Sequence, residues 1–460
     1  MATECSPARF DCAPAEGRRV VAAFDGGAIT SNAGALLLGA TDRAINLVGR
    51  FAACFRDARM PERVEHDIAT LVGQRIFGIA LGHEDVVDHD QLRHDPVLAV
   101  LAGKLAARRR DGAPLAGKST LNRLEHAPAG EPGRSHRVGH DAAAIEGVFV
   151  DLFLEAHRKA PPRQIILDLD ATDVPLHGHQ EGRFCHGDCD AYCHLPLYVF
   201  CGRHLLAAKL RRADLDASTD AVEEVARIVR RIRACWPRVR ILLRADSGFA
   251  REALMAWCEA NRVDCLFGLA RNARLVEEIA IDLAGAEDEA TRTGRPARRF
   301  RDFRWSTLDS WSRRRRVVAK AEWTRGEANP RFVVTSRKPA EAAARTLDER
   351  IYCARGEMDN RIKECQLDLF AGRASAATMR ANQLRLWFAS MAYVLLCALR
   401  RIGLAHTQFA TATCGTLRLA LLKSGAQVRR SVRRVAIAMA SGHPFQDEFA
   451  LAHARITAAA

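Results

Sequence analysis

The sequence has 460 residues, of which 48% are hydrophobic, with 69 Lys and Arg against 55 Asp and Glu and a formal net charge of +14. This length predicts about two to four domains with a sizeable core, and the positive charge favours a polyanionic partner, first of all nucleic acid. No secretion signal opens the chain, and the longest apolar run, residues 386–399, is too short to span a bilayer. We therefore expect no membrane association, a cytoplasmic, nucleoid-associated protein, and mostly reduced cysteines.

Residues 1–160 predict a helical N-terminal domain that binds DNA. Apolar residues recur at helical spacing over 63–82 and 95–110, between loops rich in Gly and Pro. Residues 112–119 match the phosphate-binding pattern G-x-x-x-x-G-K-S, but "RRRD" precedes them where a nucleotide-binding loop needs a buried strand, and Pro114 removes an N–H donor. We interpret the match as accidental and expect residues 118–125 to form a helix suited to helix-turn-helix-like contact with DNA.

Residues 161–271 predict the first part of an α/β catalytic core. Strands are expected at 164–170, 191–201 and 203–213, followed by a helix at 218–236, a strand at 239–249, a helix at 251–262 and a strand at 263–270. This β-β-β-α-β-α-β order is that of a ribonuclease-H-like fold, which needs one more helix against its sheet.

The rest of the chain predicts an insertion and a return to the core. Residues 272–349 are polar and arginine-rich and then strand-like at 313–324 and 330–337, which predicts a β-rich insertion. Residues 350–405 are helical again and supply the final core helices. Residues 406–460 form a C-terminal region with a basic patch at 428–434.

Acidic residues lie where such a core can use them. Asp168 and Asp170 are two positions apart on the first strand and so share a face, and Asp246 ends the fourth strand. Together with Asp359 on the returning helix, these carboxylates can hold two Mg²⁺ or Mn²⁺ ions that activate a nucleophile and a leaving oxygen. Two of these acids also have a simpler interpretation: Asp246 can cap the helix after it, and Asp359 can pair with Lys363.

The stretches "LDLDATDVPLHGHQEG", "LLRADSGF" and "YCARGEMDNRIKE" resemble the three acidic blocks of DDE transposases from bacterial insertion sequences. They are most similar to the insertion sequence 1380 group, which is related to the larger group with a Tyr-Arg-Glu signature. The resemblance covers essentially the whole chain. By motif, Asp170 corresponds to the first acid, with Asp168 as second choice, Asp246 to the second and Asp359 to the third.

This resemblance implies a transposase that binds the terminal inverted repeats of its mobile element. Such an enzyme cleaves double-stranded DNA and transfers the strands to target DNA with two divalent metal ions, and it acts as at least a dimer holding two DNA ends. Tyr352 and Arg355 resemble residues that grip DNA near the cleavage point, although Arg355 can also form a helical pair with Asp359. Lys363 lies on the same predicted helical face and is a further candidate for binding DNA, whereas Gln366 replaces the lysine that follows the third acid in related transposases.

The third acid departs from the family pattern, because the family usually has glutamate where this chain has Asp359. A shorter reach is compatible with a helix closer to the metals, with Glu357 or Glu364 as the true ligand, or with a weakened site. The last case leads to the alternative function, a sequence-specific DNA-binding protein derived from a transposase with a decayed catalytic site.

A cysteine and histidine cluster stands between the first two strands. The stretch "FCHGDCDAYCH" contains Cys185, His186, Cys189, Cys193 and His194, which are ligand types suited to zinc. The spacing lacks the usual C-x₂-C pairs. Core and loop thiols are therefore the favoured interpretation, with a structural zinc as the alternative.

Overall fold

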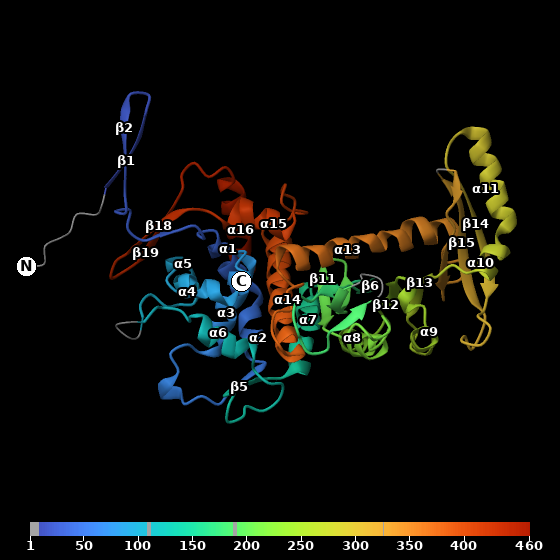
Figure 1. Ribbon diagram of the computed structural model, residues 1–460, viewed down its shortest axis with the longest axis horizontal. Helices are drawn as coiled ribbons and strands as arrows, with labels where there is room; N and C mark the ends of the chain where they lie inside the picture. Colours follow the sequence, from blue (N-terminus) through green and yellow to red (C-terminus); the bar gives the residue numbers. More distant parts are fainter. Residues whose placement is uncertain (1–8, 108–111, 187–190, 325) are drawn as a thin grey trace, which may run out of the picture. The chain divides into compact units, whose positions relative to one another are not determined.

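A computed structural model describes residues 9–107, 112–186, 191–324 and 326–460 (Figure 1). The chain forms two compact units, Met1–His140 with Met391–Ala460 (unit 1) and Asp141–Ser390 (unit 2). No helix in the described ranges is both long and apolar enough to cross a membrane. Residues 386–399 instead lie within the largely buried helix α14 (Met379–Ile402).

Unit 1 is mainly helical and carries several short two- and three-stranded sheets. Its helices are α1 (Ala35–Ile45), α2 (Leu47–Ala52), α3 (Ile68–Ala80), α4 (His89–Leu92), α5 (Pro96–Leu101), α6 (Lys118–Glu125), α15 (Cys414–Leu417) and α16 (Gln446–Ala459). Its strands are β1 (Arg9–Ala15) with β2 (Arg18–Ala23), β4 (Phe55–Asp57) with β5 (Val138–His140), and β3 (Ile29–Thr30) with β18 (Ala426–Arg430) and β19 (Val435–Met439).

Local signals explain where two of these helices begin and end. Asp67 caps α3 by accepting a hydrogen bond from Thr70 N–H at 2.7 Å, and Gly82 beyond its end has φ +92°. Asp95 caps α5 in the same way, but this helix ends at Leu101, well short of the 95–110 expected from the sequence. Gly103, at φ +68°, takes the left-handed conformation just beyond the end of α5, so apolar spacing alone overestimated its length.

Unit 2 is built on one large mixed sheet. Its strands follow the order β11 (His204–Lys209), β10 (Leu197–Cys201), β6 (Gln164–Ala171), β12 (Arg240–Ala245), β13 (Asp264–Leu269), β17 (Arg331–Thr335), β15 (Arg315–Thr324) and β14 (Ala297–Trp305), with β16 (Glu327–Ala328) beside β15. Strand β6 is antiparallel to β10 and parallel to β12, and β12 is parallel to β13. Helix α8 (Ala221–Cys235) precedes β12, and α9 (Glu252–Ala260) joins β12 to β13.

Two predicted segments differ from the observed ones. The expected strand at 191–201 is broken near Pro196, because proline has no N–H to donate to a neighbouring strand. The part before the break, β9 (Ala191–His194), pairs with β7 (Val174–Pro175) and β8 (Phe184–His186) in a small sheet, and the part after it, β10, belongs to the large sheet. In residues 272–349, the unpredicted helices α10 (Ala273–Glu278) and α11 (Ala280–Thr293) precede the strands. Those strands continue the large sheet, because β17 pairs antiparallel with β13.

The two faces of the large sheet are covered differently. On one face, alternate residues of β6 and β12 pack in a core shared with helix α7 (Ala142–Ala156), α8 and α9. On the other face, Leu242 and Leu266 pack with Leu347, Ile351 and Tyr352. This second cover is a nearly continuous helical segment: α12 (Ala344–Thr346), a π-helical stretch Leu347–Tyr352, a short 3₁₀ turn Cys353–Arg355, α13 (Gly356–Lys363) and a second π-helical stretch Glu364–Asp368. It runs beside the strands of the sheet in Figure 1.

Candidate active site

The alternation of β6 and β12 places charged residues on one face of the sheet. Ile165, Leu167 and Leu169 point into the core with α7 and α8, so Asp168 and Asp170 point to the opposite face. Strand β12 pairs in parallel with β6, with Arg244 opposite Asp168 and the pairing ending one residue before Asp170 and Asp246. Four charged side chains from two neighbouring strands therefore gather beneath the helical segment 344–368.

Asp168 is fully engaged by Arg244. Arg244 Nε lies 2.5 Å from Asp168 Oδ1, and Nη2 lies 2.8 Å from Oδ2, with both side chains buried. Arg244 Nη1 also donates to the backbone carbonyl of Ile351, next to Tyr352. Both carboxylate oxygens of Asp168 accept hydrogen bonds from Arg244. Of the two aspartates on β6, Asp170 is therefore the one whose carboxylate is available to other ligands.

Arg355 joins Asp170 to Asp359. Its Nη1 lies 3.3 Å from Asp170 Oδ2 and 3.5 Å from Asp359 Oδ1. Asp359 therefore pairs with an arginine one helical turn earlier, as one of the simpler interpretations predicted. Asp359 Oδ1 is buried and accepts no hydrogen bond from the described residues, so this oxygen has capacity for a further ligand.

Burial and crowding of negative charge set the protonation of Asp170. Desolvation raises its pKa, Arg355 lowers it, and the charges of Asp246 and Asp359 raise it further, to about 7. The pKa of Arg355 is raised, because Asp170 and Asp359 outweigh the effect of its burial. A divalent cation bound beside Asp170 would favour the ionised carboxylate and so lower this pKa.

Asp246 also acts as a cap, as its simpler interpretation predicted. Its Oδ1 accepts a hydrogen bond from Gly248 N–H at 2.9 Å at the start of the short 3₁₀ helix Ser247–Phe249. The hydroxyl of Tyr352 lies close to the backbone at Asp246 and Ser247. A Cβ built on Gly268 would come within 2.4 Å of the Tyr352 hydroxyl and within 2.9 Å of Ser247 N. Gly268 thus leaves the room that Tyr352 occupies beside Asp246.

The other acids of the helical segment have different partners. Glu357 lies 3.3 Å from Arg361, and the buried Glu364 lies 3.4 Å from the same arginine. Lys363 is exposed and forms no ion pair with Asp359 within the part of the chain that the structure describes. Gln366 lies 3.5 Å from the carbonyl of Asp173. Of the three acids considered for the third position, Asp359 is the one that lies beside Asp170.

In this structure Asp170, Asp246 and Asp359 do not form a compact set of metal ligands. Across the described ranges, no three His, Cys, Asp or Glu side chains are grouped closely enough to hold a metal ion. Asp170 and Asp359 instead share the guanidinium of Arg355. The donor chemistry still suits Mg²⁺ or Mn²⁺, because all candidate ligands are carboxylate oxygens and Asp359 Oδ1 has no hydrogen-bond donor.

Two residues of this site were not singled out from the sequence. Arg244 interrupts the apolar strand 240–245, and a charge at a buried strand position signals a buried partner. Gly268 lies within the apolar strand β13, and a glycine there signals close approach of another group. Both signals are present in the sequence, but neither identifies which group lies opposite.

The described part of the G-x-x-x-x-G-K-S loop, residues 112–119, is held by contacts within the protein. Gly117 precedes α6, and the loop before it is tied to α3 by two hydrogen bonds between Gln74 and the backbone of Ala116. Asp90 Oδ1 accepts from Lys118 N–H at 2.9 Å, and its Oδ2 lies 3.3 Å from Lys118 Nζ. A carboxylate of the protein itself thus occupies the place where this helix would bind phosphate.

The cysteine and histidine cluster lies only partly within the described residues, since Cys189 falls outside them. Cys193 and His194 are buried on β9, where Cys193 Sγ lies 3.4 Å from Asp173 Oδ1 and His194 Nε2 lies 2.9 Å from the carbonyl of Glu181. These contacts fit the interpretation as core side chains.

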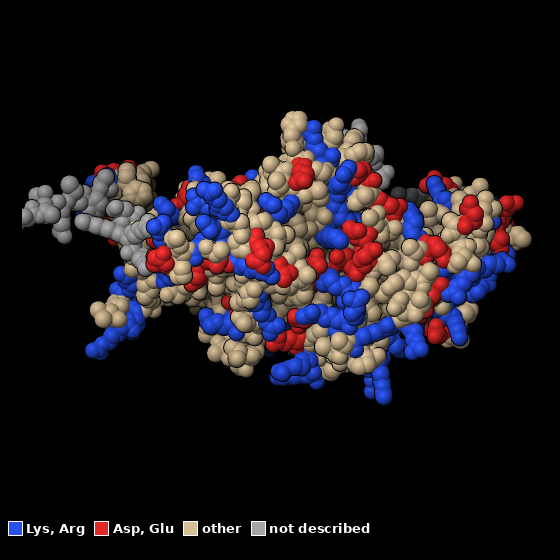
Figure 2. Space-filling view, turned by 90° about the horizontal axis from the view of Figure 1, so that it is seen from below, with Lys and Arg blue, Asp and Glu red and all other residues tan. Residues whose placement is uncertain are grey.

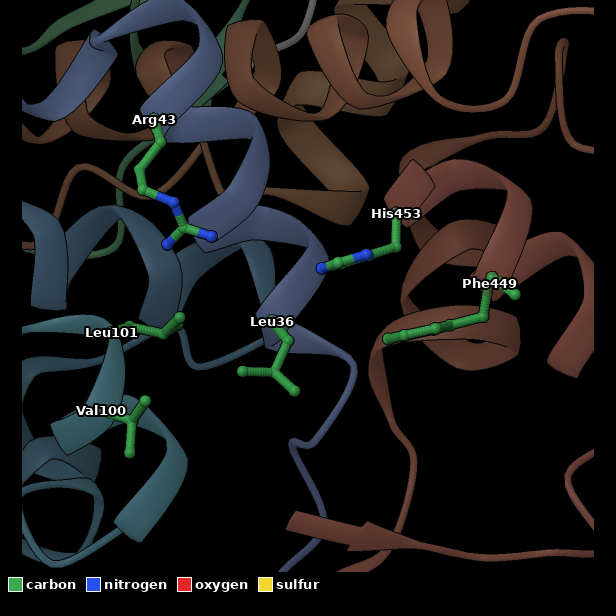
Figure 3. Close-up of a pocket in the computed structure, with 7 residues that line it drawn as sticks. Leu36, Arg43, Val100, Leu101, Phe449 and His453 are labelled. Atoms are coloured by element: carbon green, nitrogen blue, oxygen red, sulfur yellow. The ribbon is translucent and has the colours of Figure 1, made fainter. Parts of the chain in front are cut away.

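Unit 1 contains a cavity of about 510 Å³ between α1, α5 and α16 (Figure 3). It is lined mostly by apolar side chains, with Arg43 and His453 as its polar groups; the full lining is Leu36, Arg43, Val100, Leu101, Phe449, Ala450 and His453. Without a carboxylate in its lining, this cavity is not a candidate for metal-dependent chemistry.

A sheet edge with converging carboxylates, covered by a helical segment carrying Arg and Asp, is the kind of site that metal-dependent phosphodiester chemistry requires. The chain belongs to the transposase DDE domain family, group 1, whose model matches residues 12–460. No curated protein matches the chain.

One similar solved structure is a piggyBac transposase synaptic complex with hairpin DNA. It is 11% identical, covers 85% of this chain and 79% of that chain, and gives a TM-score of 0.39.

Proposed function

We propose that this transposase binds the terminal inverted repeats of its mobile element and catalyses metal-dependent cleavage and strand transfer of double-stranded DNA. The observation that carries the proposal is the gathering of Asp170, Asp246 and Asp359 around Arg355 on one face of the sheet. Membership of a DDE transposase family supports the same chemistry. The narrower assignment to the insertion sequence 1380 group rests on the sequence motifs alone.

The strand order supports a ribonuclease-H-like core. Strands β11, β10, β6, β12 and β13 are neighbours in this order, with β6 and β10 antiparallel and with β6, β12 and β13 parallel. In this arrangement the ends of β6 and β12 lie side by side, so Asp170 and Asp246 can act on one ligand. The segment containing α13 serves as the helix that brings the third acid.

Asp170, Asp246 and Asp359 are the residues that would hold two Mg²⁺ or Mn²⁺ ions. When bound, such ions activate a nucleophilic oxygen and stabilise the leaving oxygen of a phosphodiester. Arg355 has a fixed cationic fork that suits a DNA phosphate, and we propose that it leaves the two carboxylates for the phosphate when DNA binds. We also propose that Tyr352 contacts the same DNA strand and that Lys363, which is exposed four residues after Asp359, binds a neighbouring phosphate.

DNA recognition by unit 1 is part of the proposal. The exposed side of α6 carries Lys118, Ser119, Asn122 and Arg123, whereas Leu121 and Leu124 are buried. A polar, basic helical face is suited to the phosphates and base edges of a terminal repeat. We further propose that at least two copies act together on two DNA ends.

Paired binding and cleavage assays test the function. Duplexes taken from the DNA on both sides of the reading frame, which should contain matched inverted repeats, are assayed for binding in EDTA and for nicking in Mg²⁺. The proposal predicts sequence-specific binding in both conditions and nicking at the repeat end only with Mg²⁺. Specific binding with no cleavage in Mg²⁺ or Mn²⁺ would instead support the alternative, a DNA-binding protein with a decayed site, for which Asp359 in place of glutamate is the motivating observation.

A further inference from the structure

Strands β18 and β19 form a two-stranded ribbon whose tip pairs with no further strand among the described residues. β18 pairs with β19 from Ala426↔Met439 to Arg430↔Val435, but β3 covers only its inner end, at Ala426 and Gln427. Ser431 closes the tip: its N–H donates to the carbonyl of Arg434 at 2.9 Å, and its hydroxyl donates to the same oxygen at 3.1 Å. The tip is therefore a structured turn that extends into solvent.

The tip concentrates positive charge without an acidic partner. Its four arginines, all exposed, are Arg429, Arg430, Arg433 and Arg434. Arg429 donates to the side-chain oxygen of Gln427, and Arg430 donates to the carbonyl of Leu105. None of the four forms an ion pair with a carboxylate among the residues that the structure describes. In Figure 2, the projection at the lower left, at the same horizontal position as β19 in Figure 1, carries blue side chains beside tan ones. Like charges held this close repel one another, and an external polyanion relieves the repulsion.

An apolar residue stands at the apex. Val432 is fully exposed, with a relative accessibility of 105%, and two arginines precede and two follow the Ser431–Val432 pair. Exposure of this apolar side chain to water is unfavourable, so Val432 would be stabilised by contact with an apolar surface of a partner. Architectural proteins that contact the minor groove with Arg or Lys often also insert an apolar side chain as a wedge, which partly unstacks a base step.

We propose that the β18–β19 ribbon is a DNA-binding arm that enters the minor groove of double-stranded DNA, with the four arginines on the flanking phosphates and Val432 as the wedge. The proposal rests on the proposed function, in that DNA is the partner, and adds a site distinct from α6 and from the acids of unit 2. The pre-formed turn favours DNA over a lipid surface, because a wedge needs a defined geometry whereas charge attraction to a membrane does not.

The first test measures binding of the full-length protein to a fluorescent duplex of mixed sequence in EDTA, so that cleavage does not contribute. Arg433→Ala/Arg434→Ala should weaken binding about 10- to 100-fold and lower the slope of log affinity against log salt by about 2, because two phosphate contacts are lost. Arg292→Ala/Arg295→Ala removes two exposed arginines of unit 2 and serves as the matched control. An arm variant that behaves like this control overturns the proposal.

The second test separates the wedge from the charges. Val432→Ser should leave the salt slope unchanged but reduce DNA bending, measured by energy transfer between dyes at the two duplex ends, since a wedge kinks DNA by about 20–90°. Unchanged bending overturns the minor-groove assignment. Vesicles of phosphatidylserine test the other polyanion: loss of vesicle binding in Arg433→Ala/Arg434→Ala with unchanged duplex affinity also overturns it.

Failure of the proposed arm can be distinguished from failure of the proposed function. The arm is tested without metal by affinity and bending, whereas the function is tested by nicking in Mg²⁺. A protein whose arm variants bind duplex weakly, but which never cuts DNA, keeps the arm and loses the catalytic proposal. A protein that cuts DNA with arm variants binding normally keeps the catalytic proposal and loses the arm.

Discussion

The buried pair Asp168–Arg244 offers a quantitative test of how the site is held together. Arg244→Met removes the guanidinium while keeping most of the side-chain length. The Asp168 side chain is 8% exposed and that of Arg244 is 6%, so the variant leaves an unpaired carboxylate in the interior, which costs about 3–5 kcal/mol. The carbonyl of Ile351 loses a donor as well, which adds about 1 kcal/mol.

The matched variants are Asp168→Leu and Asp168→Leu/Arg244→Met. Replacing both charges removes the unpaired group, so the double variant should be more stable than Arg244→Met alone, with an interaction energy of at least about 2 kcal/mol in the double-mutant cycle. Urea unfolding followed by tryptophan fluorescence is the assay. All 6 tryptophans of the chain lie in residues 141–390, so the signal reports on unit 2. Effects that add to within about 0.5 kcal/mol would refute the coupling.

Four further predictions concern the chemistry. Asp246→Asn should abolish Mg²⁺-dependent nicking and leave duplex binding in gel shifts nearly intact, since asparagine can still cap Gly248; retained nicking would reject Asp246 as a ligand. Asp359→Glu should keep or raise the cleavage rate if short reach is its only defect, whereas Asp359→Ala should lose at least about 100- to 1000-fold; an alanine variant as fast as the parent rejects the site. Lys118→Ala should leave nicking largely in place at protein concentrations that saturate the DNA, because Lys118 is assigned to DNA contact and not to a nucleotide site, and neither protein should hydrolyse ATP; ATP hydrolysis by the parent that is lost together with nicking in the variant would restore the nucleotide-site interpretation. Because the pKa of Asp170 is about 7, protons compete with metal below that pH, so the Mg²⁺ concentration for half-maximal cleavage should rise about tenfold for each pH unit below 7 and level off above it; a constant value from pH 5.5 to 8 contradicts this.

The same pKa carries a stability prediction whose sign can be worked out. The folded-state pKa of Asp170 lies above the ordinary value of 3.8. At Asp170 the folded protein therefore binds more protons than the unfolded chain between about pH 4 and 7, so the contribution of this group to metal-free stability falls as pH rises through that window and no longer changes above it. Added Mg²⁺ should consequently raise the melting temperature more at pH 8 than at pH 5.5.

The alternation of apolar and charged residues along β6 and β12 made much of the candidate site predictable from the sequence. The apolar residues of 164–170 fix which face of β6 is buried in the helix-covered core, and this places Asp168 and Asp170 on the opposite face. The order of elements after β6 brings β12 beside it, so Asp246 near Asp170 could also be predicted. Spacing further predicted that Tyr352, Arg355 and Asp359 share one face of a helix, and the resemblance to DDE transposases implied that this face lies beside the acids.

What could not be predicted depends on contacts between distant segments. The choice between Asp168 and Asp170 depends on Arg244, 76 positions later, which occupies both oxygens of the first. Nothing local in the sequence shows that the strands of 272–349 add to the core sheet, because the pairing of β17 with β13 joins segments about 65 residues apart. Asp359 and Lys363 both lie in the regular helix α13, four residues apart and so on one face. Helical spacing did not show that Asp359 pairs with Arg355 and that Lys363 is exposed.

The central claim, that Asp359 completes a set of ligands for a catalytic metal, is tested most directly by changing the ligand and the metal together. Asp359→Cys replaces an oxygen ligand, preferred by Mg²⁺, with a sulfur ligand that binds Mg²⁺ poorly and softer ions such as Cd²⁺ well. The account predicts that Asp359→Cys is inactive in Mg²⁺ and regains strand cleavage when Cd²⁺ or Mn²⁺ is added, whereas Asp359→Ser stays inactive in every metal. Equal cleavage by parent, cysteine and serine variants in Mg²⁺, or recovery of the serine variant to the same extent as the cysteine variant, would contradict it.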